Sequence, residues 1–181
     1  MRWPDWLKQR EHCLAVVMGL VDGILTAMLL GAGRMLGWGM PIDFKIALKV
    51  AVYALATAGF VFYIGRYAEF RAQLVHAAAQ LNLKKGGQLA TTHLGRMVLG
   101  EAVGEAIVSG GCSFMSALLP LSLAVVFPSA PWSSVILSLC LLGILGYALG
   151  RMVKGSSLKW AVGLVAGGVF MTILGSGLHI L

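Results

Sequence analysis

Five apolar runs divide the chain, and each is about long enough to cross the hydrocarbon core of a bilayer, which takes roughly 20 residues of α-helix. They occupy residues 13–33, 46–65, 98–127, 134–150 and 160–181. Lipid cannot hydrogen-bond an exposed backbone, so segments of this kind cross the membrane as helices. The sequence therefore predicts an all-α, polytopic membrane protein with five transmembrane helices, in which residues 1–181 form a single transmembrane domain surrounded by membrane lipid.

The composition and the charge distribution agree with this reading. Hydrophobic residues make up 59% of the 181 residues and charged residues 12%, too few for the polar exterior of a soluble domain. The net charge of +7 does not indicate nucleic-acid binding, because Lys and Arg lie beside the apolar runs and form no basic helix interleaved with aromatic residues. In the predicted five-span topology, 11 of the 14 basic residues lie on the same side of the membrane as the N-terminus. The positive-inside rule then places the N-terminus in the cytoplasm and the C-terminus on the opposite side.

The second and third predicted helices each have a feature in addition to their membrane span. Apolar residues recur at helical spacing in residues 66–97, which predicts that the second helix extends into the cytoplasm as an amphipathic helix, ending at Gly86 and Gly87. Its apolar face is expected to pack against the bundle or a partner rather than the membrane surface, and Thr91 or Thr92 would cap the next helix. The third run contains a glycine pair, 110–111, and Pro120, which favour a kink or a division there.

One aspartate, Asp22, lies in the middle of the first apolar run. A charge at this depth costs about 2.5 to 3.5 kcal/mol on insertion scales, so the carboxylate must be neutralised, paired or hydrated. Met18 and Thr26 lie one turn away on the same face, and Gly19 and Gly23 beside it allow close approach of a backbone or an ion. A carboxylate with a thioether and a hydroxyl suits a divalent transition metal better than Mg²⁺ or Ca²⁺. The alternative is a structural hydrogen-bond acceptor between helices.

A polar stripe opens the third run. It comprises Glu101, Glu105, Ser109, Cys112 or Ser113, and Ser116. Carboxylates at positions i and i+4 of a helix can share a divalent cation or a proton, as the inner mouth of a proton-coupled cation route requires. The alternative is a solvated helix start, where acidic residues favour the positive end of the helix dipole. Glu69 is expected to pair with Arg66 or to be solvated.

Motifs for common enzymes and cofactors are absent from the sequence. It contains no nucleophile elbow, phosphate-binding loop, dinucleotide glycine fingerprint or H-E-x-x-H motif. The three cysteines lie singly, without the spacing of a zinc or disulfide framework. We therefore expect neither an enzyme nor a bound cofactor.

Three segments, in chain order, resemble the vacuolar iron transporter family. "GLVDGILTAMLLGAG" is similar to the family's first-helix signature G-x-x-D-G, "SGGCSFMSALLPL" to its third helix, and "LKWAVGLVAGGVFMTILGSGL" to its last helix. The resemblance implies a homodimeric exchanger that moves Fe²⁺ or Mn²⁺ out of the cytoplasm against protons. Its ion route would lie at the two-fold interface and be lined by Asp22.

The chain departs from the family at two places. The segment "YALATAGFVFYIGRY" contains neither the acid nor the methionine of the family's second helix. Typical members also have a long cytoplasmic insertion rich in Glu and Met, whereas residues 66–97 have one acidic residue, Glu69, and one methionine, Met97. The sequence thus looks like a divergent, minimal relative, in which Glu101 and Glu105 would replace the missing cytoplasmic ligands.

The predicted function is transport of a divalent metal cation across the membrane in exchange for protons. Asp22 would be the central metal ligand, Glu101 and Glu105 the inner-mouth ligands or proton carriers, and Met18 and Thr26 lesser contacts. One alternative is a non-transporting scaffold or assembly subunit, in which Asp22 pins helix packing. A transporter for an organic or anionic solute is disfavoured, because the predicted spans contain no inward basic residue.

Overall fold

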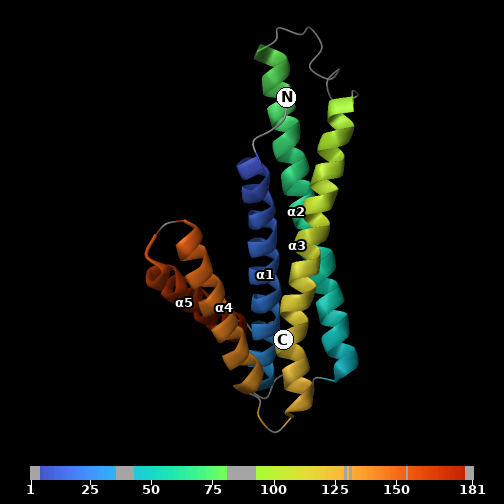
Figure 1. Cartoon of the computed structure of the whole chain (residues 1–181). Helices are drawn as coiled ribbons and strands as arrows, with labels where there is room; N and C mark the ends of the chain where they lie inside the picture. Colours follow the sequence, from blue (N-terminus) through green and yellow to red (C-terminus); the bar gives the residue numbers. More distant parts are fainter. Residues whose placement is uncertain are drawn as a thin grey trace.

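The computed structural model describes residues 5–35, 43–80, 93–128, 130, 132–153 and 155–177. In these residues the chain forms five helices, α1 (Asp5–Met35), α2 (Phe44–Gln80), α3 (His93–Val126), α4 (Trp132–Met152) and α5 (Ser157–Gly177). Each contains a stretch long and apolar enough to cross a membrane. The all-α, five-span prediction is confirmed, and Figure 1 shows the arrangement.

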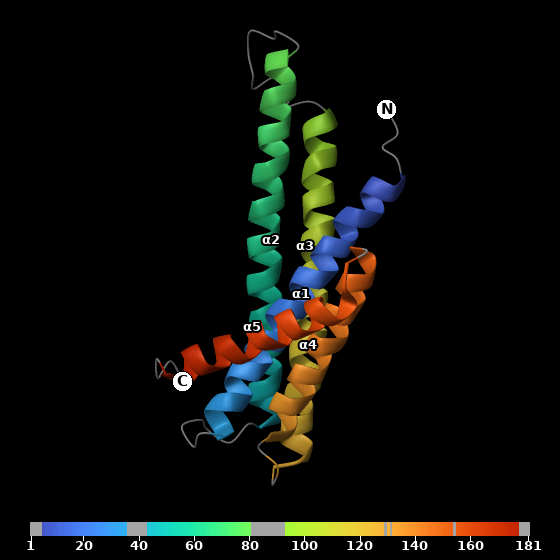
Figure 2. The same cartoon turned by 90° about the vertical axis from the view of Figure 1, so that its left-hand side faces the viewer.

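The three long helices form the main bundle. α2 and α3 lie side by side along most of their length, and α1 packs obliquely along α3 (Figures 1 and 2). Much of the core between them is alanine, with Leu121 of α3 as its largest fully buried aliphatic side chain. The buried alanines of the two clusters are Ala27 on α1, Ala47, Ala51 and Ala54 on α2, and Ala117 and Ala124 on α3. Small residues let helix backbones approach closely, which is how helices pack when lipid surrounds them.

Two glycines bring α1 directly against the backbone of α3. A Cβ atom on Gly19 would overlap the carbonyl oxygen of Ser109, and one on Gly23 would overlap the carbonyl oxygen of Ser113. Only glycine leaves room for this crossing, so Gly19 and Gly23 fix the register of α1 on α3.

The second unit of packing is the pair α4 and α5, which lies on the α1 side of the bundle, away from α2 (Figure 1). Gly146 and Gly150 of α4 let α5 approach: a Cβ on Gly146 would lie 2.6 Å from the Cα of Ala161. α5 crosses obliquely in front of α1 and α4 (Figure 2), and only 6% of its apolar stretch is buried within the chain. Most of α5 therefore faces outward.

The predicted features of α2 and α3 have different outcomes. α2 continues unbroken from the membrane segment to Gln80, as predicted for the second helix. The expected end at Gly86 and Gly87 and the Thr91 or Thr92 cap lie outside the described residues. α3 is continuous from His93 to Val126 with Pro120 inside it, so of the two expected alternatives, a kink or a division, the division does not occur.

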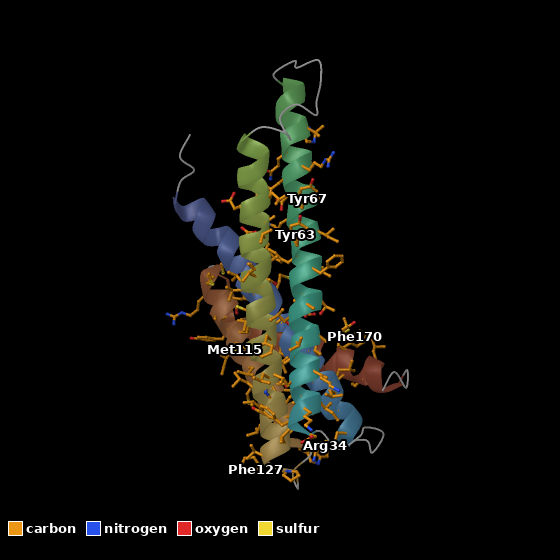
Figure 3. The ribbon with its side chains drawn as sticks, turned by 90° about the vertical axis from the view of Figure 1, so that its right-hand side faces the viewer. Arg34, Tyr63, Tyr67, Met115, Phe127 and Phe170 are labelled. Carbon is orange, nitrogen blue, oxygen red and sulfur yellow. The ribbon has the colours of Figure 1, made fainter. Side chains whose placement is uncertain are left out.

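The far end of α3 is closed by a side chain from α1. Arg34 donates hydrogen bonds to the carbonyl oxygens of Ala124 (2.8 Å) and Pro128 (2.9 Å). Figure 3 shows Arg34 at this end of the bundle, near Phe127. The guanidinium satisfies carbonyl groups that a helix C-terminus leaves without intrahelical donors.

Candidate functional site

A row of buried polar side chains runs along the inner face of α3. It consists of Glu105, Ser109, Ser113 and Ser116, each no more than 3% exposed. Their steps of three or four residues place them on one face, as the sequence indicated. Glu101, one turn before Glu105, is exposed. The predicted stripe is therefore internal from Glu105 onward and external at Glu101.

Asp22 joins this row from α1. The Ser113 hydroxyl lies 3.1 Å from Asp22 Oδ2 and 3.2 Å from the carbonyl oxygen of Ala54 on α2, and it can donate to either. Ser113 is thus the point where α1, α2 and α3 meet. Asp22 itself is exposed on the surface of the single chain. The Asp22 carboxylate therefore accepts a hydrogen bond from the buried Ser113 on one side and is exposed at the surface of the chain on the other.

The two predicted lesser contacts lie on either side of Asp22 along α1. Met18 is 56% exposed, so its thioether is open to the surroundings of the chain. The Thr26 hydroxyl donates to the backbone carbonyl oxygen of Asp22 at 2.9 Å. Thr26 therefore contacts the backbone of Asp22 within α1.

An ion-pair network joins α2 to the start of the row. Arg66 Nε lies 2.5 Å from Glu105 Oε2, and Arg66 Nη2 lies 3.1 Å from Glu105 Oε1, so the guanidinium binds the carboxylate through two nitrogens. Arg66 Nη1 also donates to Glu69 Oε2 at 2.8 Å. The guanidinium carbon lies 4.7 Å from the centre of the Phe70 ring. The expected pairing of Glu69 with Arg66 is present, and Glu105 is a second partner.

Sequence reasoning missed the pairing of Arg66 with Glu105. Arg66 lies one residue beyond the predicted second span, 46–65, but within the longer apolar stretch of α2, Phe44–Gln73, and is 7% exposed, so an inward basic residue is present there. The sequence contained a usable signal, since an ionisable residue inside an apolar span needs a partner. Two carboxylates, those of Glu105 and Glu69, bind this guanidinium.

The structure does not bring the predicted metal ligands together within one chain. Ser113, the partner of Asp22, follows Glu105 by eight residues, which is about 12 Å along a helix. Among the described residues, no group of three or more His, Cys, Asp or Glu side chains could hold a metal ion. A metal site at Asp22 would need ligands from outside this set, such as hydroxyls, carbonyls, water or a second chain.

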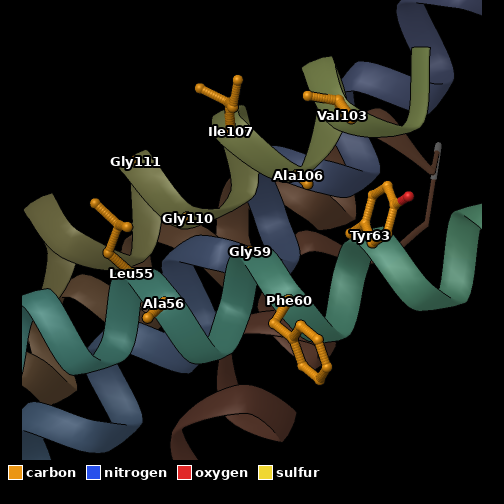
Figure 4. A pocket seen from close by; sticks show the side chains of 10 residues that line it. All are labelled: Leu55, Ala56, Gly59, Phe60, Tyr63, Val103, Ala106, Ile107, Gly110 and Gly111. Carbon is orange, nitrogen blue, oxygen red and sulfur yellow. The ribbon is translucent and has the colours of Figure 1, made fainter. Parts of the chain in front are cut away.

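A groove of about 460 Å³ lies between α2 and α3 (Figure 4). It is lined by Leu55, Ala56, Gly59, Phe60, Tyr63, Val103, Ala106, Ile107, Gly110 and Gly111. Apart from the Tyr63 hydroxyl, these side chains are apolar. The groove contains no charged group and no part of the polar row, so it offers nothing to an ion.

The helices and the buried row together define a polytopic α-helical membrane protein with ionisable side chains inside its bundle. No model of a known protein family, no curated protein and no solved structure matches this chain. The resemblance to the vacuolar iron transporter family rests on the three sequence segments alone.

Proposed function

We propose that the protein transports a divalent metal cation such as Fe²⁺ or Mn²⁺ in exchange for protons, exporting the metal from the cytoplasm. The observation that carries this proposal is Asp22, a carboxylate within an apolar span that is bonded to Ser113 on one side and exposed on the other. An ionisable residue inside a membrane span has a high free-energy cost, and such residues commonly mark ion pathways.

The exposed side of Asp22 supports a homodimer. Leu14, Met18 and Asp22 follow one another at four-residue steps, and all three are exposed. In a single chain this face would press a carboxylate into lipid. A second copy packed on the same face would cover it and place two Asp22 carboxylates near a two-fold axis, where they would share one divalent cation.

Proton coupling follows from the chemistry of a carboxylate ligand. Asp22 must be deprotonated to bind a metal ion, so metal and protons compete for the same oxygen atoms. Loading of metal on one side and of protons on the other then yields exchange. No cofactor or enzymatic step is needed.

The test measures uptake of Fe²⁺, Mn²⁺, Co²⁺ and Zn²⁺ into liposomes containing the purified protein, with a pH gradient imposed. Asp22→Asn keeps the size of the side chain and an oxygen that can accept from Ser113, so we expect a folded protein whose flux falls about 10- to 100-fold, as when metal ligation is impaired. Asp43→Asn is the matched control. Asp43 is exposed and accepts a hydrogen bond from the Phe44 amide at 2.8 Å, a capping role that Asn performs equally well.

Two results would count against the proposal. Equal flux in Asp22→Asn and the wild type would remove Asp22 from the ion route. No flux of any of the four metals by the folded wild-type protein would reject transport altogether. The second candidate, a scaffold in which the Ser113–Asp22 hydrogen bond pins α1 on α3, would then stand, and Asp22→Asn should leave its assembly intact.

A further inference from the structure

Arg66 neutralises a carboxylate that has almost no contact with solvent. Glu105 is 1% exposed and Arg66 7%, whereas the Glu69 side chain is 52% exposed. The three groups carry one positive and two negative charges. Of the two carboxylates, Glu105 is the buried one and Glu69 the exposed one.

Arg66 cannot discharge itself, because a guanidinium stays protonated in proteins. A buried carboxylate is strongly destabilised when its positive partner is removed, so Glu105 holds Arg66 until another cation replaces it. The Phe70 ring, which already faces the guanidinium, is a second favourable surface for a cation. Arg66 therefore keeps one favourable contact if another cation takes Glu105.

The position of the pair matters for ion movement. Glu105 is the first buried member of the row that leads to Ser109, Ser113 and Asp22. A cation that enters the row at this end meets a carboxylate already bound to a guanidinium. Two cations on one buried carboxylate repel each other, so the metal and Arg66 exclude each other there.

We propose that Arg66 is a tethered counter-cation, which binds Glu105 while no metal is present and releases Glu105, keeping its contact with the Phe70 ring, when a divalent cation binds Glu105 and Glu69. This inference rests on the proposed transport function and adds a residue that sets the affinity for the ion. Arg66 acts as an internal competitor, so it lowers the affinity for metal and favours release of the ion from Glu105.

The first experiment uses the wild-type protein in detergent. Phenylglyoxal, an arginine-specific reagent, is added with and without Mn²⁺, and modification of each arginine is followed by mass spectrometry. We expect saturating Mn²⁺ to accelerate modification of the buried Arg66 several-fold, while the exposed Arg71 reacts at an unchanged rate. An unchanged rate at Arg66 in a preparation that transports Mn²⁺ would overturn the inference.

The second experiment measures the KM for Mn²⁺ in liposomes. A neighbouring unit charge alters the affinity of a carboxylate for a cation by about tenfold or more. Arg66→Gln should therefore lower KM about tenfold, and Arg66→Gln/Glu105→Gln, which removes both charges, should abolish that gain. An unchanged KM in Arg66→Gln contradicts the inference.

Failure of the two proposals is distinguishable. If the wild-type protein moves no metal, the transport function fails and this inference fails with it. If the wild-type protein moves Mn²⁺ and Asp22→Asn does not, but neither the labelling of Arg66 nor the KM responds as expected, only the role of Arg66 is wrong. Labelling uses the wild-type chain, so it decides the question even where Arg66→Gln does not fold.

Discussion

Replacing Gly19 by alanine adds a methyl group at the point where α1 crosses α3. The new Cβ atom would overlap the carbonyl oxygen of Ser109 and lie 2.9 Å from its carbonyl carbon and 3.0 Å from its Cα. All three are backbone atoms, so no side-chain rotation relieves the contact. The two helices must separate or shift along each other.

The expected loss of stability follows from two opposing effects. Alanine stabilises a helix interior by about 0.5 to 1 kcal/mol relative to glycine. Overpacking costs about 1 to 3 kcal/mol, and a clash with backbone belongs at the upper end of that range. Gly19→Ala should therefore be destabilised by about 2 kcal/mol. For a chain of this size that lowers the melting temperature by roughly 4 to 8 °C.

Gly104→Ala is the matched control. Gly104 lies in the interior of α3, and nothing within 4 Å would meet its Cβ atom. It makes the same chemical change without a neighbour to displace, so its melting temperature should equal or slightly exceed that of the wild type.

The assay is thermal unfolding of the purified protein in one detergent, followed by circular dichroism at the helical band. Reasoning from the α1–α3 contact would be refuted if Gly19→Ala melted at or above the wild-type temperature. The same conclusion would follow if Gly19→Ala and Gly104→Ala shifted the melting temperature equally.

Two further changes test the ends of the bundle and the polar row. Arg34→Gln removes charge-assisted hydrogen bonds to Ala124 and Pro128, worth about 1.5 to 3 kcal/mol each, and should lower the melting temperature clearly more than Arg151→Gln, whose side chain is exposed. Ser113→Ala removes the internal partner of Asp22 at a cost of about 1 kcal/mol and should reduce metal flux more than stability. Ser122→Ala, whose hydroxyl donates only to Leu119 of its own helix in the contacts observed, should leave flux unchanged, and equal flux in the two serine variants would contradict the role of Ser113.

The sequence predicted the helices well because their cause is local. A run of apolar residues long enough to cross the bilayer forms a helix whatever its neighbours are, so all five spans and the continuation of α2 to Gln80 could be predicted from the sequence. The Arg66–Glu69 ion pair could be predicted for the same reason, since residues three apart share a helix face. A division of α3, one of the two alternatives expected at its glycine pair and Pro120, does not occur, because neighbouring helices support a continuous backbone past Pro120, which is buried.

Contacts between helices could not be predicted from the sequence in the same way. Periodicity along α3 placed Glu105 on the polar face, but nothing in it identified Arg66, 39 residues earlier, as the partner. Glycine is equally ambiguous in the sequence. Gly19 lies against backbone and Gly104 lies in open space, and only the packing of α1 on α3 distinguishes them.

The same packing also positions the candidate site. Gly23 rests against the carbonyl group of Ser113, and Asp22 is the residue before it, so the contact that seats α1 on α3 delivers the carboxylate to the Ser113 hydroxyl. A bulkier residue at Gly23 would change stability and the Asp22–Ser113 distance together. Gly19 lies one turn away against Ser109, where a change disturbs packing without removing any group of the site. Comparison of flux and melting temperature in Gly19→Ala and Ser113→Ala therefore separates what the helix crossing contributes to the fold from what it contributes to ion movement.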